Sequence, residues 1–159
     1  MLIDISRKLE ASIAVWPGDA PFRLERSLAI AAGAAVNLTA LSLSAHTGTH
    51  VDAPYHFDDA GLRMDEVGLE AYWGPAQVVT VRKPAGPLLP EDLAHVALGR
   101  APRLLVRSSG SLLAHDQFPK EFVYPTPELA EVLGAAGVVL YGADTPSMDA
   151  VESKALPGH

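Results

Sequence analysis

The chain has 159 residues, 48% of them hydrophobic, which is enough for one domain with a sizeable core. It contains no cysteine, so disulfides and a cysteine nucleophile are excluded, and any bound metal must be held by nitrogen and oxygen ligands. The formal net charge of −7 and the scattered positions of the twelve lysines and arginines argue against a nucleic-acid partner.

The N-terminal residues, MLIDISRKLEASIAVW, lack the basic region followed by an apolar run that marks a secretory signal. The longest apolar run, residues 28–36, is far shorter than the roughly 20 residues needed to cross a bilayer. We therefore expect a cytoplasmic protein with no membrane partner.

Residues 41–45, LSLSA, alternate apolar and polar side chains, which predicts a strand with the serines on one face. Four possible metal ligands lie an even number of residues beyond these serines and so share their face if the alternation continues: His46, His50, Asp52 and His56. In a straight strand the Cα atoms of His46 and His50 would lie ~13 Å apart, too far to share an ion. We therefore expect the chain to bend at Gly48, because the β-branched residues around this glycine disfavour a helix.

The later segments predict an α/β fold. Two short apolar runs are typical of buried strands, residues 103–107 and 138–144, and residues 76–82 are a further strand candidate for the same sheet. A short helix is expected over 90–99, and a longer one over 126–137, with Thr126 as its N-cap. Strand, helix and strand in this order favour a crossover connection. We therefore predict a mixed β-sheet or a barrel-like sheet core with flanking helices.

Two features outside the histidine segment have simpler interpretations. Asp144 follows a predicted strand and is expected to cap the amides of Thr145 and Ser147. Ser108 and Ser109 lack the surroundings of a catalytic nucleophile and are interpreted as loop serines.

The histidine segment is best explained as a metal site. A lone histidine is usually a structural residue with a backbone hydrogen bond, but three of the chain's six histidines gather here beside an aspartate. Imidazole and carboxylate ligands without thiolate suit zinc, with manganese or iron as alternatives. Three protein ligands would leave one coordination position for water, which is typical of a catalytic site.

The residues from His46 to His56, HTGTHVDAPYH, resemble the HxGTHxDxPxH signature of the metal-dependent cyclase family, most closely its bacterial kynurenine formamidases (arylformamidases). Two further segments are similar to other parts of the family pattern: LIDISRKLEASIAVWPGD, residues 2–19, and YGADTPSMD, residues 141–149. The resemblance covers essentially the whole chain. It implies a cyclase-like fold of the swivelling β/β/α type.

The resemblance also implies a set of metal ligands. By position, His46, His50 and Asp52 bind one zinc, and Asp52 bridges to a second zinc that His159 also binds. The complete protein would then hold two zinc ions per subunit. The family's bridging glutamate has no counterpart up to His159, so we expect residues 1–159 to form a single cyclase-like domain that lacks the family's C-terminal segment.

Two further roles follow from the resemblance. It implies that His56 donates and accepts the catalytic proton and that Trp16 contacts the substrate. From the residues alone, His56 is open to a second interpretation as a fourth metal ligand. Trp16 lies in the turn-forming sequence VWPGD, where a large aromatic side chain serves equally well in a core.

The expected function is zinc-dependent hydrolysis of N-formyl-L-kynurenine to L-kynurenine and formate in tryptophan degradation, by a homodimer. The chemistry is consistent, because zinc lowers the pKa of its bound water to about 7 and a nearby histidine can protonate the leaving nitrogen. Two alternatives remain open: an enzyme acting on another small amide or ester, and a metal-binding relative without turnover. Fold and motif do not choose among substrates.

Overall fold

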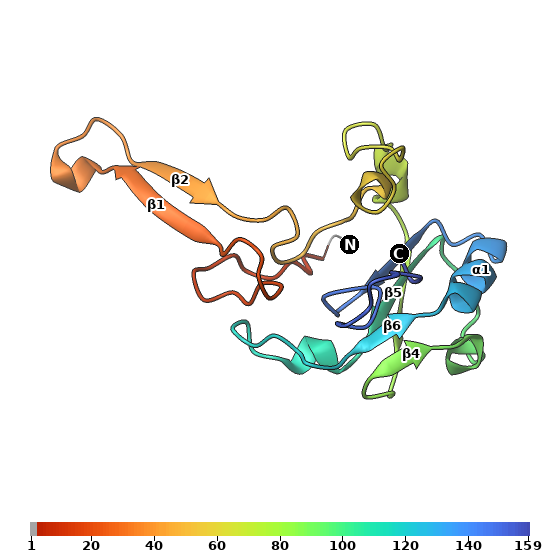
Figure 1. Cartoon of the computed structure of the whole chain (residues 1–159). Helices are drawn as coiled ribbons and strands as arrows, with labels where there is room; N and C mark the ends of the chain where they lie inside the picture. Colours follow the sequence, from red (N-terminus) through yellow and green to blue (C-terminus); the bar gives the residue numbers. More distant parts are fainter. Residues whose placement is uncertain (1–2) are drawn as a thin grey trace. The chain divides into compact units, whose positions relative to one another are not determined.

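The computed structural model describes residues 3–159 and divides into two compact units (Figure 1). Unit 1 extends to Asp52 and also includes Ala114–Phe118, whereas unit 2 comprises Ala53–Leu113 and Pro119–His159. The described strands form one antiparallel and two parallel sheets. No sheet within residues 3–159 closes into a barrel, and no helix there has the length and apolar character to cross a bilayer.

Unit 1 contains an antiparallel hairpin of β1 (Arg23–Leu28) and β2 (Leu38–Ser42), which lie side by side in Figure 1. Every residue of both strands is exposed. The strand predicted over 41–45 is therefore displaced toward the N-terminus, because pairing with β1, rather than burial of one face, determines its extent. The small core of unit 1 includes Ile13 and Phe22.

The central sheet of unit 2 contains the three predicted strands; the middle strand is largely buried, whereas the other two are half-buried or exposed. It consists of β3 (Ala76–Thr80), β5 (Arg103–Arg107) and β7 (Leu140–Ala143), all parallel, with β5 in the middle. Leu104 and Val106 of β5 are almost fully buried. A central parallel strand is covered on both faces, which explains its continuous apolar sequence.

A second parallel pair, β4 (Gly86–Leu88) and β6 (Val123–Pro125), leads into the helix α1 (Pro127–Ala135), as Figure 1 shows. The hydroxyl of Thr126 accepts a hydrogen bond from the backbone N–H of Leu129 at 3.3 Å, which confirms the predicted N-cap. One apolar cluster joins these elements to the central sheet: Val79, Val81, Leu88, Leu93, Leu104, Val106, Val123, Leu129 and Leu133.

The short helix expected over 90–99 is a single 3-10 turn, η4 (Pro90–Leu93), followed by irregular turns. Leu93 is 1% exposed in the core, and Val96 and Leu98 from the irregular turns pack against the same core. These contacts are made without a longer helix, whose nucleation would carry an additional cost. The α/β class is confirmed, with parallel and antiparallel strands in separate sheets.

Candidate metal centre

The chain bends at Gly48, between His46 and His50, as the sequence predicts. Gly48 has φ 73°, a left-handed conformation that disfavours other residues. A Cβ atom at this position would lie 2.9 Å from Cδ2 of Leu9 and 3.4 Å from Cδ1 of Ile13. Glycine is therefore required both by the backbone conformation and by close packing within unit 1.

This bend brings three donor atoms together. Nδ1 of His46 lies 3.3 Å from Nε2 of His50 and 2.9 Å from Oδ1 of Asp52, and Nε2 of His50 lies 3.5 Å from the same oxygen. Two ligands bound tetrahedrally to zinc, with bonds of ~2.0–2.1 Å, are about 3.3 Å apart. The three donors therefore have the spacing of ligands to one tetrahedral metal ion.

The tautomer of His50 also suits a metal ligand. Its Nδ1 lies 2.9 Å from the carbonyl oxygen of Gly48 and donates its proton there, which leaves a lone pair on Nε2. When Nε2 is also protonated it can donate to the Asp52 carboxylate, which raises the pKa of His50 against the opposing effect of partial burial. The site therefore favours positive charge between these side chains, which a divalent cation would supply.

Trp16 lies in a tight turn of unit 1. The backbone N–H of Asp19 donates to the carbonyl of Trp16 at 2.9 Å, and Gly18 takes φ 91°. The half-buried indole ring meets the ring of Phe118 edge-on, with 5.4 Å between centroids. The ring therefore has a packing partner within its own unit and still keeps exposed surface, so neither of the two sequence interpretations is removed.

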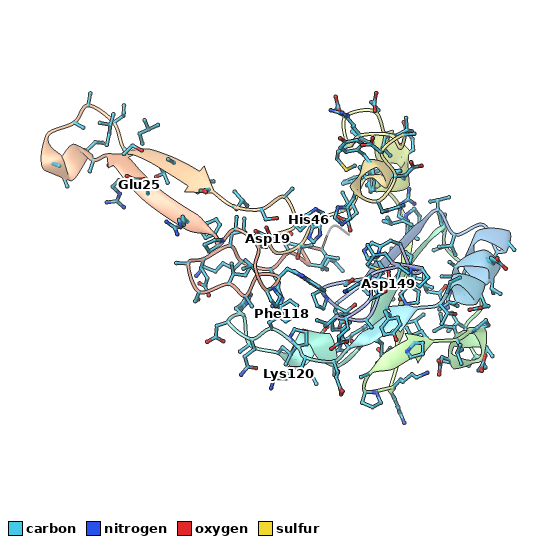
Figure 2. All side chains as sticks on the ribbon, in the orientation of Figure 1. Asp19, Glu25, His46, Phe118, Lys120 and Asp149 are labelled. Atoms are coloured by element: carbon cyan, nitrogen blue, oxygen red, sulfur yellow. The ribbon has the colours of Figure 1, made fainter. Side chains whose placement is uncertain are left out.

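Asp19, which the sequence analysis did not assign to the site, links this turn to the histidine segment. Hydrogen bonds from the Ser44 hydroxyl and the Ala20 backbone lower the pKa of Asp19. The same Ser44 oxygen accepts from the backbone N–H of His46 at 3.2 Å. Figure 2 shows Asp19 beside the segment that carries His46. Its only sequence signal is its place in the WPGD turn.

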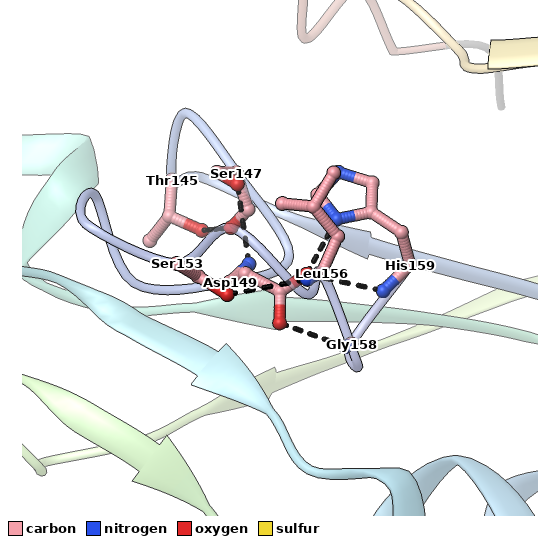
Figure 3. A network of polar contacts seen from close by, with 7 residues as sticks. All are labelled: Thr145, Ser147, Asp149, Ser153, Leu156, Gly158 and His159. Atoms are coloured by element: carbon pink, nitrogen blue, oxygen red, sulfur yellow. Dashed lines mark hydrogen bonds and ion pairs between the residues drawn. The ribbon is translucent and has the colours of Figure 1, made fainter. Parts of the chain in front are cut away.

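The structure brings His56 and His159 together within unit 2. His56 ends a 3-10 turn, η2 (Pro54–His56), that packs closely on Gly61, where a Cβ atom would lie 2.8 Å from the Pro54 carbonyl oxygen. The imidazole centroids of His56 and His159 are 5.9 Å apart. The His159 side chain is 8% exposed and contacts the carboxylate of Asp149, a residue that the sequence analysis missed (Figure 3).

Asp144 differs from its predicted role. Its carboxylate accepts hydrogen bonds from the backbone and hydroxyl groups of Ser108 and Ser111, at 2.5–2.9 Å. Partial burial raises the pKa of Asp144, but these hydrogen bonds outweigh it and lower the pKa overall. The carboxylate therefore organises the loop after β5. A local capping rule could not find these partners, because they become neighbours only when β5 and β7 pair.

The fold and the histidine segment define the class of protein. Residues 3–150 match the family described as Putative cyclase, and the chain belongs to this family. Within the family it is 40% identical, over 157 residues, to the kynurenine formamidase of Geobacillus thermodenitrificans (strain NG80-2), covering 99% of this chain and 74% of that relative. The resemblance expected from the sequence is thus confirmed.

Two solved structures share the fold. One is described as a potential metal-dependent hydrolase with cyclase activity. It superposes with a TM-score of 0.75, and the match covers 99% of this chain and 72% of that structure's chain. The other is described as a predicted metal-dependent hydrolase from Bacillus stearothermophilus. Its TM-score is 0.79, and the match covers 99% of this chain and 74% of that structure's chain. Each is 20% identical to this chain, and both confirm the cyclase-like architecture.

Proposed function

We propose that the protein is a metal-dependent hydrolase that converts N-formyl-L-kynurenine to L-kynurenine and formate in tryptophan degradation. The observation that carries this proposal is the triangle of donor atoms from His46, His50 and Asp52, with mutual distances of 2.9–3.5 Å. The 40% identity to a kynurenine formamidase supports the choice of substrate.

Zinc is the proposed metal, because the donors are two imidazoles and a carboxylate in tetrahedral spacing and the chain has no thiolate. When bound, a zinc ion supplies a water nucleophile at neutral pH and polarises the formyl carbonyl. The protein's own contribution at this point is orientation. Gly48 provides both the bend and the carbonyl that holds His50, and Asp52 supplies the negative charge.

His56 is proposed as the group that takes a proton from the attacking water and returns it to the aniline nitrogen as the amide C–N bond breaks. Histidine is the side chain suited to both steps near neutral pH. The η2 turn and its close contact with Gly61 support this role, because they hold His56 on a rigid segment. Trp16 is proposed to contact the aromatic ring of the substrate with the exposed part of its indole.

A second zinc is also part of the proposal. From the family resemblance, Asp52 would bridge to this ion and His159 would bind it, so the complete protein would hold two zinc ions per subunit. We also propose that residues 1–159 act as one cyclase-like domain. The expected cytoplasmic location stays a prediction.

We propose a homodimer, with the β1–β2 hairpin as the contact surface. An isolated two-stranded hairpin is marginally stable in water, and both strands here are exposed along their full length. The exposed residues include six large apolar side chains on the hairpin and its connection: Leu24, Leu28, Ile30, Val36, Leu38 and Leu41. Covering such a surface with a second copy would remove it from water.

Formate release from N-formyl-L-kynurenine is the direct test, measured with and without a chelator and after zinc is restored. Activity that depends on zinc is expected. Hydrolysis of other small amides or esters, but not of this substrate, would move the enzyme elsewhere in the family. Zinc binding without any turnover would leave a metal-binding relative.

A substitution of Asp52 tests the proposed metal site directly. Asp52→Asn should lose zinc during dialysis, because the carboxylate belongs to the donor triangle, whereas Asp59→Asn, at an exposed aspartate on the same stretch, should retain it. Elemental analysis of both proteins makes the comparison. Stoichiometric zinc in Asp52→Asn at wild-type affinity would contradict the proposed centre.

A further inference from the structure

Asp149 is a buried carboxylate in the loop that follows β7. It is 2% exposed, and both its oxygens accept hydrogen bonds from the end of the same loop (Figure 3). Oδ1 accepts from the backbone N–H of Gly158 at 2.7 Å. Oδ2 accepts from the backbone N–H of His159 at 3.2 Å and lies 2.5 Å from Nδ1 of its imidazole. One carboxylate thus binds both the backbone and the ring of His159.

The loop folds closely around this carboxylate. A Cβ atom at Gly158 would lie 2.0 Å from the Met148 carbonyl oxygen and 3.0 Å from Oδ1 of Asp149, so only glycine fits there. Leu156 takes the left-handed φ of 47°, which is unfavourable for leucine. The contacts of Asp149 therefore hold His159 in one position.

These hydrogen bonds also determine which nitrogen of His159 is protonated. Two backbone N–H groups donate to Asp149, so the carboxylate acts as an acceptor and the short contact with Nδ1 requires a proton on that nitrogen. Nε2 is then left with its lone pair. The ring packs against those of His56 and Phe57, each with 5.9 Å between centroids.

We propose that Asp149 is a positioning residue that fixes the Nδ1–H tautomer and the ring orientation of His159, so that Nε2 is presented to a divalent transition metal such as zinc. This inference rests on the proposed function, in which His159 binds the second zinc. A carboxylate behind a ligand imidazole also increases its basicity, and loss of such a partner typically weakens metal binding about 10–100-fold.

A purely structural role of Asp149 would give a different result from a role in positioning His159. If Asp149 only closed the loop, removing any hydrogen bond of that loop would have the same effect as removing the carboxylate. Ser153→Ala is the matched control, because the Ser153 hydroxyl accepts from the Leu156 backbone in the same loop and has no contact with the imidazole of His159 in the described structure. Asp149→Asn is the test variant, and thermal melts confirm that both proteins are folded.

The first measurement uses metal-free protein and long-range ¹H–¹⁵N NMR of the imidazoles, with His159→Gln to assign the signals. In the wild type and Ser153→Ala, His159 should carry its proton on Nδ1. In Asp149→Asn the proton should move partly or wholly to Nε2. An unchanged tautomer in Asp149→Asn would overturn the inference. If that variant does not fold, Asp149→Ser takes its place with the same expectation.

The second measurement is a zinc titration of the same proteins. Asp149→Asn should weaken the second zinc site about 10–100-fold and leave the first unchanged, whereas Ser153→Ala should leave both within a few-fold. Equal weakening by the two variants would reduce Asp149 to a structural residue. Full second-site binding by His159→Gln would remove His159 as a ligand and overturn the inference.

Formate release measured in parallel separates the two proposals. Wild-type protein that binds two zinc ions, shows the expected changes in Asp149→Asn and releases no formate would contradict the proposed function while supporting the inference. Zinc-dependent hydrolysis together with an unchanged tautomer in Asp149→Asn would support the proposed function and contradict the inference about Asp149.

Discussion

Two imidazoles of this protein are held through the same ring nitrogen by chemically different acceptors. His50 donates from Nδ1 to the carbonyl of Gly48, whereas His159 donates from Nδ1 to the carboxylate of Asp149. In each case Nε2 keeps its lone pair. The neutral acceptor is a neighbour in sequence and the charged one comes from the same loop, so both orientations are set by short segments of chain.

His56 is the residue whose substitution separates chemistry from metal binding. We expect His56→Ala to retain zinc and to lower kcat by about 10²–10⁴-fold, because a proton-transfer group acts in the transition state. His95→Ala, at an exposed histidine, is the control. Zinc analysis and steady-state rates check the prediction.

Either departure from this result would be informative. Loss of zinc from His56→Ala would make the side chain a ligand, which is the alternative that the sequence leaves open. A rate within a few-fold of the wild type would end both roles.

At the scale of elements, the turn that follows β2 determines whether His46 and His50 converge. Gly48 and Gly33 both have positive φ, 73° and 89°, but an added Cβ atom would meet other side chains within 4 Å only at Gly48. This pair therefore separates the cost of the backbone conformation from the cost of close packing.

Gly48→Ala should lower both the free energy of unfolding and the zinc affinity. The left-handed conformation costs about 1–2 kcal/mol for alanine at either position. Only at Gly48 must a neighbouring side chain, Leu9, also shift, and the bend at this residue is what brings His46 and His50 together. Denaturant unfolding and zinc titration of Gly48→Ala and Gly33→Ala make the comparison, and equal zinc affinity in the two variants would contradict it.

The hydrogen bonds between Asp144 and the loop after β5 should make the free energy of unfolding depend on pH in the acid range. The pKa of Asp144 is lowered in the folded protein, so its contribution is complete above the ordinary value of 3.8 and is lost as the pH falls through the folded pKa. Asp144→Asn should therefore be less stable than the wild type at pH 7, by about 1–3 kcal/mol, since it leaves the buried donors of Ser108 poorly paired.

Below pH 4 the difference between Asp144→Asn and the wild type should shrink. Thermal melts from pH 7 to pH 3 measure this, with Asp65→Asn, at an exposed aspartate, as the control. A constant difference across the whole range would show that the hydrogen bonds of Asp144 do not depend on its charge.

At the scale of the whole molecule, the exposed hairpin has the clearest consequence for assembly. We expect a dimer by light scattering at micromolar concentration, and we expect Leu41→Asp to shift it toward monomer. Leu41 is 59% exposed on β2, whereas Leu69, which is 79% exposed in unit 2, provides the control Leu69→Asp. A wild-type monomer, or equal effects of both variants, would contradict the hairpin interface.

The sequence by itself determined the features that depend on neighbours along the chain. The residues His46, His50 and Asp52 lie within one short segment, and the bend at Gly48 is a local backbone property, so their convergence could be predicted. The same holds for the Thr126 cap and for the buried strand β5, whose apolar run is continuous.

Only the tertiary structure decided which distant groups share a hydrogen bond. Asp144 meets Ser108 and Ser111 because β5 pairs with β7. A single aspartate forms no repeating pattern in a sequence, and its hydrogen-bond partners lie at no fixed sequence distance from it. Asp149 therefore escaped prediction, since the fold of its loop, rather than any pattern of residues, brings its oxygens to His159.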